Sequence, residues 1–434
     1  MSRSFPKSTA DRGRQGGPAT LPAGASAGLA TIARRSIDRV ARGRLATLPL
    51  ALRFWDGSSL QLGPERPEAT LLVRGPSVVA RLLREPTELG LAEAWMTGEL
   101  DVEGDLDTVV RLRDRFTGLH FSWLDRARIA AAAIRVAGTS VFRPLSAPAT
   151  EAHQSGRPHS LDRDRAAIRH HYDVSNRFYE LLLGPTMSYS CGAFASPVDS
   201  LETAQEHKHE LICQKLALKP GERLLDIGCG WGSLLLHAVR HHRVRGIGVT
   251  LSERQARLAR ERVRDDGLSD QIEIRIADYR QLTDAPYDKI ASVGMYEHVG
   301  AGNYDTYIRK VRSLLRPGGL FFNDGIARLL SGPRIGENFI SRYVFPDGEL
   351  HPLTALLTRI EGAELEIRSV QSLREDYART LRSWYSNLER HRAQARAEIG
   401  EQRVRVWELY MLGSAHSFTR GEITNYHVVA QRPG

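Results

Sequence analysis

Cysteine is scarce in this chain, with only three among 434 residues: Cys191, Cys213 and Cys229. Their spacing matches neither a zinc-binding pattern nor a disulfide framework, so the sequence predicts no metal site and a reducing, cytoplasmic environment. No apolar run approaches the roughly 20 residues that a membrane-spanning helix needs. No apolar core of a secretory signal follows the first arginines. These absences favour a cytoplasmic protein without a transmembrane anchor.

Acidic residues are outnumbered, at 51 Asp and Glu against 60 Lys and Arg, which gives a formal net charge of +9. A basic balance favours polyanions, either nucleic acid or the anionic face of a bilayer. No recognisable nucleic-acid-binding module accompanies the charge, so we expect a membrane surface and no nucleic acid. Residues 29–45 alternate apolar positions and arginines at helical spacing. This pattern fits a helix on a membrane surface as well as an amphipathic helix packed on its own domain.

Composition divides the chain into four segments, and its length suits two domains. Residues 1–28 are rich in Gly, Pro, Ser and Arg, which predicts a disordered basic tail. In residues 29–142, short strand-like runs broken by turn signals begin at about Leu45 and helical patterns follow, which predicts a small α+β domain. Residues 143–160 have the composition of a linker. Residues 161–434 then form the predicted catalytic domain.

Strands alternate with helices in this last segment. Buried strands are expected to begin at Arg223, Val244, Ile272, Lys289 and Leu320. This alternation predicts the α/β class, with a doubly wound, Rossmann-like sheet that is mainly parallel. Ligands bind such sheets at the carboxyl ends of the strands.

A glycine-rich turn, LLDIGCGWG at 224–232, joins the first of these strands to a helix. Gly228, Gly230 and Gly232 permit positive φ and let a ligand approach the backbone. Their spacing differs from the Gly-x-Gly-x-x-Gly dinucleotide pattern. Asp226 precedes the turn, as in methyltransferases, where an acidic residue faces the methionine end of adenosylmethionine. The turn alone is compatible with either cofactor.

The next strand ends in Thr250, where a dinucleotide-binding protein usually places Asp or Glu to hold the ribose. Ser252 and Gln255 have the spacing of a helix capping box, which also permits contact between Gln255 and a cofactor. This strand end therefore favours adenosylmethionine over a dinucleotide.

Several motifs, taken in order, are similar to those of a known family. The chain resembles the cyclopropane-fatty-acyl-phospholipid synthases and the related mycolic acid cyclopropane synthases from about Ala166 to its C-terminus, and GLAEAWMTGELDVEGDL resembles the small N-terminal domain of the phospholipid-acting members. The motifs are HYDVSNRFYELLLGPTMSYSCGAF, LKPGERLLDIGCGWGSL, GVTLSERQ, ADYRQL, SVGMYEHVG and NYDTY.

The resemblance implies a class I methyltransferase fold that uses S-adenosyl-L-methionine to modify the double bond of an acyl chain in a membrane phospholipid. It also implies a homodimer, and the N-terminal segment is expected to associate with the inner face of the membrane. The residues implied to bind the cofactor are Tyr189, Ser190, Asp226, Gly228, Cys229, Gly230, Trp231, Gly232, Thr250, Leu251, Gln255, Asp278 and Tyr279.

The same resemblance implies a catalytic group of Cys191, Glu297 and Tyr385, with Ile326 nearby. In the family these positions and one histidine hold a bicarbonate ion that serves as the base. Here RPGGLFFNDGI places Asp324 at the histidine's position. Ionised Asp can only accept hydrogen bonds, which disfavours bicarbonate beside Glu297, although the two acids can also raise each other's pKa.

Our hypothesis is that Glu297 stabilises a cation on the acyl chain, while Asp324 or an anion near it removes the proton. Loss of the proton from the new methyl group closes a cyclopropane ring. A hydride shift before this loss leaves a methylene branch, which a separate reductase would convert to a methyl branch. VFPDGEL and VWELYMLGS resemble the branch-forming relatives, so ring and branch both stay open.

Other interpretations of the same residues also stay open. A methyltransferase of small molecules would share the glycine turn, and a catalytically silent lipid- or cofactor-binding protein would explain Asp324. Cys191 also fits a small buried apolar residue, and Tyr385 fits a helix core. His170, His171 and His298 receive no catalytic role.

Overall fold

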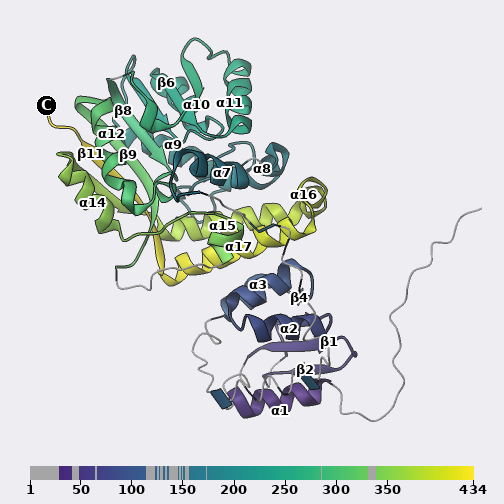
Figure 1. Ribbon diagram of the computed structural model, residues 1–434. Helices are drawn as coiled ribbons and strands as arrows, with labels where there is room; N and C mark the ends of the chain where they lie inside the picture. The colour runs from purple at the N-terminus through teal and green to yellow at the C-terminus, as the bar shows by residue number, and fades with distance from the viewer. Residues whose placement is uncertain are drawn as a thin grey trace, which may run out of the picture.

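The computed structural model describes residues 29–41, 48–63, 66–113, 156–172, 174–284, 286–330 and 339–434, together with isolated positions between 123 and 151. These residues form a smaller unit with a four-stranded sheet and a larger unit with a seven-stranded sheet (Figure 1). The predicted tail, residues 1–28, and part of the predicted linker lie outside the described residues.

The smaller unit is an α+β arrangement built on the strand order β2-β1-β3-β4, in which β1 and β3 are parallel. An Asp-Gly turn joins β1 to β2, and Gly57 adopts the positive φ of 82° that this turn requires. The elements are α1 (Leu29–Ala41), β1 (Leu50–Phe54), β2 (Ser59–Gln61), β3 (Ala69–Val73), α2 (Pro76–Arg84), α3 (Glu88–Met96), β4 (Leu100–Gly104) and α4 (Leu106–Arg111).

The first half of helix α1 lies on its own sheet, which favours the packed-helix interpretation of the arginine-rich segment. Ala30 and Ala33 pack against the buried leucines of β1 and β2. The backbone N–H groups of Leu29 and Ala30 donate to Asp56 Oδ2 and Ser58 Oγ at 2.9 and 3.0 Å.

The larger unit confirms the predicted α/β class. Its sheet has the order β10-β11-β9-β8-β5-β6-β7, in which the five strands from β9 to β7 are parallel and β11 is antiparallel to both of its neighbours, β9 and β10. The strands expected from the sequence are all present. The strands are β5 (Arg223–Ile227), β6 (Arg245–Thr250), β7 (Ile272–Ile276), β8 (Tyr287–Val293), β9 (Leu315–Arg328), β10 (Glu366–Ser372) and β11 (Ile423–Gln431).

Helices cover both faces of this sheet, and a long antiparallel pair, α15 and α17, lies between the sheet and the smaller unit (Figure 1). Short 3-10 turns follow β7 and β8 at Tyr279–Gln281, Tyr296–His298 and Ala301–Asn303. The helices are α7 (Leu161–Tyr172), α8 (Asn176–Leu183), α9 (Leu201–Lys215), α10 (Ser233–His242), α11 (Glu253–Asp265), α12 (Tyr304–Leu314), α13 (Phe339–Tyr343), α14 (Leu353–Gly362), α15 (Arg374–Arg390), α16 (Arg392–Ile399) and α17 (Glu401–Arg420). Within the described part of the chain, no helix combines the length and apolar character needed to cross a bilayer.

Trp95 on α3 joins the two units. Its indole N–H donates to the carbonyl of Arg405 on α17 at 3.1 Å, and the Arg405 guanidinium lies 4.6 Å from the centre of the Trp95 ring. Arg405 in turn donates to the Trp95 carbonyl at 3.0 Å. Trp95 also belongs to the buried cluster that contains Trp384 and Trp407 of the larger unit, so the two units share one apolar core.

We predict that Trp95→Ala lowers the free energy of unfolding by about 3–5 kcal/mol, because it removes a buried indole and leaves a cavity between the units. Denaturant unfolding of the full chain measures this loss. Trp123, whose exposed fraction is 76%, provides the matched control, and Trp123→Ala should leave stability unchanged. A loss for Trp95→Ala no larger than that of the control would contradict a shared core.

Candidate active site

One cavity lies at the carboxyl ends of the parallel strands, where the topology predicts a ligand. Its wall includes the residues that end β5, β6 and β8, together with Asp278 just beyond β7. Helix α7 contributes Ile168 and Tyr172, and helix α9 contributes Lys208 and Ile212. The cavity is therefore bounded by the sheet edge on one side and by two helices that precede the sheet in the chain.

Most residues implied to bind the cofactor lie on this wall. Gly232 is absent from the lining and instead occupies the N-cap position of α10, with a φ of 80°. The residues on the wall are Tyr189, Ser190, Asp226, Gly228, Cys229, Gly230, Trp231, Thr250, Leu251, Gln255, Asp278 and Tyr279.

The glycine turn needs residues without a Cβ. Gly228 and Gly230 have φ values of 84° and 54°, in the left-handed region that other residues rarely adopt. The backbone N–H groups of Gly228 and Cys229 both donate to the carbonyl of Val249, at 2.9 and 3.0 Å. A Cβ on Gly228 would come within 3.2 Å of the Met295 side chain. The turn thus follows the end of β6 closely and presents backbone to the cavity.

Asp226 is a buried carboxylate in the cavity wall, and only 3% of it is exposed. Its Oδ1 atom has no hydrogen-bond partner among the described residues. Burial raises the pKa of Asp226 to about 7, although the charge of Lys208 opposes this shift. A buried, unpartnered carboxylate atom fits a positively charged ligand group, such as the methionine ammonium of adenosylmethionine.

Lys208 is a polar wall residue that the sequence analysis missed. It is 2% exposed, and its Nζ donates to Ser190 Oγ at 2.8 Å. Burial lowers its pKa to about 8, while the nearby carboxylates of Asp324 and Asp226 act in the opposite direction. Lys208 therefore lies between the cofactor cavity and the catalytic group. Its position within the α9 pattern QEHKHEL resembles an ordinary exposed helix charge, so the sequence contained no signal for it.

The Ser252 half of the capping box predicted for α11 is confirmed, while the backbone N–H of Ser252 donates to Thr250 Oγ1 at 3.2 Å. Ser252 is the N-cap, and its Oγ accepts a hydrogen bond from the backbone N–H of Gln255 at 3.1 Å. The Gln255 side chain accepts a hydrogen bond from Thr250 Oγ1 at 2.8 Å and also lines the cavity. One helix start thus orients two polar side chains at the end of β6.

Glu297 and Ile326 are brought together beside the cavity. Glu297 Oε1 accepts a hydrogen bond from the Ile326 backbone N–H at 2.7 Å, while Oε2 has no partner among the described residues. Burial raises the pKa of Glu297 to about 7, and the charge of Asp324 adds to this shift. The carboxylate is therefore held by one oxygen, and the other oxygen is available to a reacting group.

Cys191 follows Tyr189 and Ser190 of the cavity wall and is fully buried. Its Sγ lies 3.2 Å from the carbonyl oxygen of Gly192 and 3.6 Å from that of Leu373. Burial raises the pKa of the Cys191 thiol well above its usual range, and the nearby charge of Asp324 raises it further. Cys191 is thus a neutral thiol and not a nucleophilic thiolate.

Asp324 lies within β9 and is 2% exposed. Its register partner on the antiparallel strand β11 is His427, whose Nε2 lies 3.5 Å from Asp324 Oδ2. Neither of these two atoms has a hydrogen-bond partner within the described ranges. His427 Nδ1 lies 3.2 Å from Lys215 Nζ at the end of α9. A buried line of polar groups therefore runs from Asp324 through His427 to the partly exposed Lys215.

The structure does not place Tyr385 with this group, and Tyr377 takes the expected position. Burial raises the pKa of Tyr377, with further contributions from Tyr410, Cys191, Asp324 and Glu297. The acidic groups that act on Tyr385 are instead Glu389, Glu408, Asp105 and Asp107.

The helical geometry of α15 explains this correction. Tyr377 and Tyr385 are eight residues apart, which corresponds to about 12 Å along a helix axis. The backbone N–H of Leu373 donates to the carbonyl of Asn425 at 2.9 Å, which holds the first turn of α15 against β11. The first turns of the helix, rather than its middle, therefore contact the catalytic group. In the sequence, Tyr377 stands in the DYARTL segment, shortly after strand β10, and this position could have indicated that Tyr377 lies near the catalytic group.

Aromatic rings surround the same region. The Tyr189 ring lies 5.5 Å from that of His171 and 5.1 Å from that of Trp384. The Tyr189 hydroxyl donates to the Tyr410 hydroxyl at 3.2 Å. The Tyr377 ring lies 6.2 Å from that of Trp384. Aromatic faces attract cations, so this environment suits a reaction that develops positive charge.

Comparison with known families supports the same assignment. Residues 159–428 match the family described as mycolic acid cyclopropane synthetase, and residues 43–115 match a domain of unknown function. The chain is 39% identical to "Probable fatty acid methyltransferase" of Pseudomonas putida, over 89% of this chain and 92% of that protein.

Two further relatives differ in the product that their names indicate. The chain is 33% identical to the cyclopropane-fatty-acyl-phospholipid synthase of Escherichia coli K12, over 84% of this chain and 88% of that protein. It is 32% identical to the tuberculostearic acid methyltransferase of Mycobacterium tuberculosis, over 99% of this chain and 98% of that protein.

The larger unit is also similar to a solved structure. The mycolic acid cyclopropane synthase CmaA1, solved with SAH and CTAB, matches with a TM-score of 0.58 and 31% identity over 62% of this chain and 98% of that chain. Together with the glycine turn and the unpartnered Asp226 carboxylate, these similarities identify S-adenosyl-L-methionine as the co-substrate.

We predict that adenosylmethionine binds more tightly as the pH rises through about 7. Asp226 is protonated below its raised pKa, and only its ionised form attracts the positive charge of the ligand. Between about pH 6 and about pH 8, affinity should rise roughly tenfold, as expected for one linked proton. Isothermal titration calorimetry at several pH values measures this change.

Asp226→Asn should bind more weakly and lose the pH dependence. Glu408 also has a pKa raised to about 7 by burial but does not line the cavity, so Glu408→Gln is the matched control and should keep the slope. A slope that persists in Asp226→Asn would show that another group carries the linked proton.

Proposed function

Because the chain belongs to the mycolic acid cyclopropane synthetase family and is an adenosylmethionine-dependent methyltransferase of lipids, we propose a specific reaction for it. It transfers a one-carbon unit to the cis double bond of an acyl chain in a membrane phospholipid. The observation that carries the proposal is the buried group formed by Cys191, Glu297, Asp324 and Tyr377 beside the cofactor cavity. Lys208 connects the two places, because it donates to Ser190 of the cavity wall and lies within electrostatic reach of Asp324.

Adenosylmethionine supplies an electrophilic methyl group bound to a positively charged sulfur. The π electrons of the acyl double bond form the new carbon–carbon bond, and positive charge then develops on the acyl chain. Glu297, with one oxygen free of hydrogen bonds, stabilises this charge together with the faces of Tyr377 and Tyr189. The neutral Cys191 thiol packs against the reacting region without competing for the methyl group.

Asp324 is the proposed base that replaces bicarbonate. Its carboxylate takes a proton from the methylated chain, and the electron pair of that C–H bond closes the ring or forms the exo-methylene bond. The proton then passes to Nε2 of His427, while the proton on Nδ1 passes to the neutral amine of Lys215. Burial lowers the pKa of Lys215 to about 8, so a fraction of this amine is neutral near pH 7.

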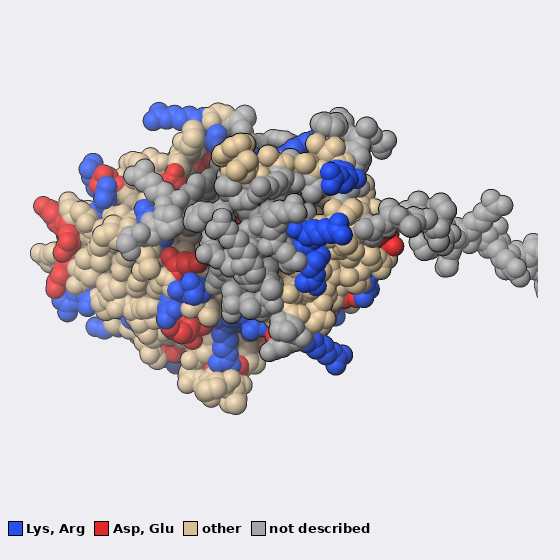
Figure 2. All heavy atoms as spheres, turned by 90° about the horizontal axis from the view of Figure 1, so that it is seen from below, with Lys and Arg blue, Asp and Glu red and all other residues tan. Residues whose placement is uncertain are grey.

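Exposed leucines near the catalytic group support a lipid substrate. Leu329 and Leu330 follow the end of β9 and are 50% and 73% exposed. Exposed apolar side chains of this kind fit contact with acyl chains. On the face seen from below, Lys and Arg side chains are interspersed with Asp and Glu (Figure 2). We therefore assign contact with the anionic bilayer to apolar insertion as well as to charge. The homodimer stays a prediction.

Ring closure is the first proposed outcome, and a methylene or methyl branch is the second. Asp324 is compatible with the branch, because both products lose a proton from the new methyl group and differ only in whether a hydride shift precedes that loss. The similarity to tuberculostearic acid methyltransferase along almost the whole chain supports the branch. A branch would require a separate reductase to saturate the methylene group.

We predict that a host expressing this chain and fed methyl-labelled methionine accumulates acyl chains that have gained one labelled carbon. Mass spectrometry of total fatty acids detects the gain, and fragmentation separates a ring from a branch and locates the carbon. Glu297→Gln should abolish the labelled product. A folded chain that binds adenosylmethionine but labels no acyl chain would contradict the lipid function.

We predict that Asp324→Asn lowers turnover by about 10²–10⁴-fold, the contribution expected of a general base, while adenosylmethionine affinity changes little. His427→Phe keeps the packing against Phe322, whose ring lies 4.8 Å from that of His427, and should cause a smaller loss by interrupting the proton route. Turnover on labelled phospholipid vesicles measures both effects. Tyr385→Phe is the control and should retain activity, whereas normal turnover in Asp324→Asn would assign the base elsewhere.

A further inference from the structure

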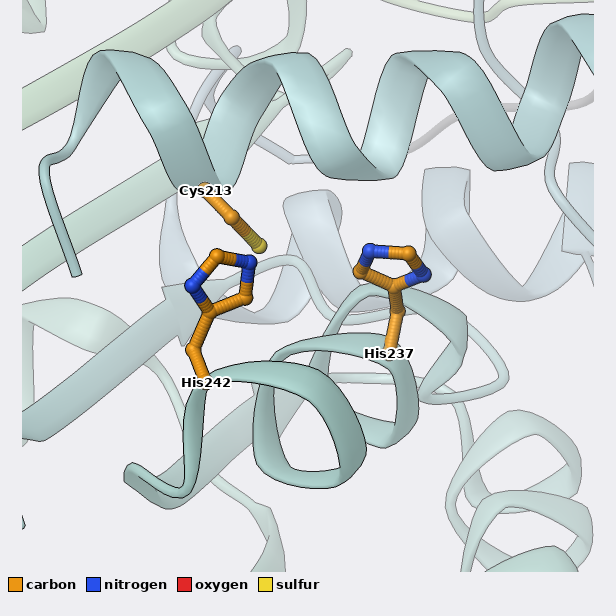
Figure 3. A group of neighbouring side chains, drawn as sticks. All are labelled: Cys213, His237 and His242. Atoms are coloured by element: carbon orange, nitrogen blue, oxygen red, sulfur yellow. The ribbon is translucent and has the colours of Figure 1, made fainter. Parts of the chain in front are cut away.

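Helices α9 and α10 bring three metal-ligating side chains together outside the catalytic group. Cys213 comes from α9, and His237 and His242 come from α10. The sulfur and one nitrogen of each imidazole lie within 4.8 Å of one another. Figure 3 shows both rings turned toward the Cys213 sulfur, with the cysteine descending from one helix and the histidines rising from the other.

A carboxylate adjoins this cluster. Glu210 lies one turn before Cys213 on α9, and its Oε2 is 3.1 Å from His237 Nε2 and 3.0 Å from His242 Nε2. Hydrogen bonds from His242 and His237 lower the pKa of Glu210 to about 2, so its carboxylate is ionised. One oxygen thus orients both imidazoles.

The cluster is also accessible from solvent. Glu210 is 37% exposed, His242 is 20% exposed and His237 is 15% exposed, whereas Cys213 is fully buried. Solvent exposure therefore decreases from the carboxylate oxygen through the imidazole nitrogens to the sulfur. An ion can enter past the carboxylate, as a functional metal site requires.

We propose that Cys213, His237 and His242 bind one Zn²⁺ ion, with Glu210 as the fourth ligand. Sulfur, two imidazole nitrogens and one carboxylate oxygen form a donor set that suits tetrahedral zinc. With bonds of about 2.0–2.3 Å, the ligand atoms of such a site lie roughly 3.5 Å apart, so the present arrangement closes by small side-chain rotations. The thiolate disfavours hard cations such as Mg²⁺ and Ca²⁺.

The ion would cross-link two helices that border the cofactor cavity. Lys208 and Ile212 on α9 line that cavity, as do Ser233 and Leu234 on α10. The zinc ion would therefore stabilise the packing of these two helices and take no part in methyl transfer. Because the ion binds only the folded arrangement of these helices, zinc should raise the thermal stability of the full chain.

The test uses the full chain without a histidine tag, stripped of metal by a chelator. Titration with ZnCl₂ should show one ion per chain, and MgCl₂ should give no binding. Co²⁺ serves as a spectroscopic probe, because a thiolate ligand produces a sulfur-to-cobalt charge-transfer band in the near ultraviolet. This band and the rise in melting temperature with zinc are the expected results.

Variants then assign the ligands. Cys213→Ala should remove the charge-transfer band, and His242→Gln should weaken zinc binding by more than about 100-fold, beyond the usual effect of a group that only orients a ligand. His241→Gln is the matched control, because His241 neighbours the cluster in α10 but is not one of its ligands. Melting of each metal-free variant verifies that it folds.

Two results would overturn the proposal. One is the absence of stoichiometric zinc binding, and the other is unchanged binding by Cys213→Ala and His242→Gln, which would assign the metal to other histidines. Neither measurement depends on a lipid substrate. Failure of the zinc site and failure of the proposed lipid reaction are therefore separate outcomes.

Discussion

The concentration of buried negative charge at the carboxyl edge of the sheet is the constraint on which this structure depends. Asp226, Glu297 and Asp324 are all largely removed from water, and ionised carboxylates are costly to bury without partners. The pKa values of Asp226 and Glu297 rise to about 7 as a consequence. Lys208 offsets part of this charge, and the positively charged methyl donor offsets more of it when it binds. The site is stabilised by the charges that it is built to bind.

The rest of the molecule keeps water away from these acids. The aromatic cluster between α15, α17 and the smaller unit covers the catalytic group, and Trp95 extends that cluster across the boundary between the units. Low local dielectric strengthens every electrostatic interaction inside. The smaller unit contains none of the acids of the catalytic group, yet it completes the apolar environment in which they act. Its association with the larger unit is therefore part of the catalytic design.

Local patterns in the sequence predicted those parts of the site that depend on local geometry. The glycine turn at 228–232 and the Ser252 cap need only particular backbone angles and one nearby donor, so their residue types indicate them directly. The mainly parallel character of the sheet followed from alternation of strands and helices. The catalytic position of Asp324 was predicted by counting residues from the Arg-Pro-Gly-Gly segment, which lies in the same strand, β9.

Residues that depend on packing between distant segments escaped the same reasoning. Tyr385 and Tyr377 share one helix and similar surroundings in sequence, and only the contact between the first turn of α15 and β11 selects Tyr377. His427 lies beside Asp324 because the two residues are register partners on antiparallel strands, and no sequence motif near either residue predicts this pairing. Cys213 and the two histidines of α10 likewise belong to no spacing pattern, because two helices bring them together from opposite sides.

The Asp324–His427 pair explains how the family's catalytic region tolerates an acid in the place of a histidine. An imidazole is still present within 3.5 Å of the position, but it comes from the neighbouring strand and stands behind the carboxylate. In the proposed mechanism the acid takes the proton, and the imidazole with Lys215 provides the outlet for it. A base held by the chain would remove the need to bind a separate anionic base next to Glu297, where like charges would oppose it. The proposed base would then be part of the chain and not a bound ion.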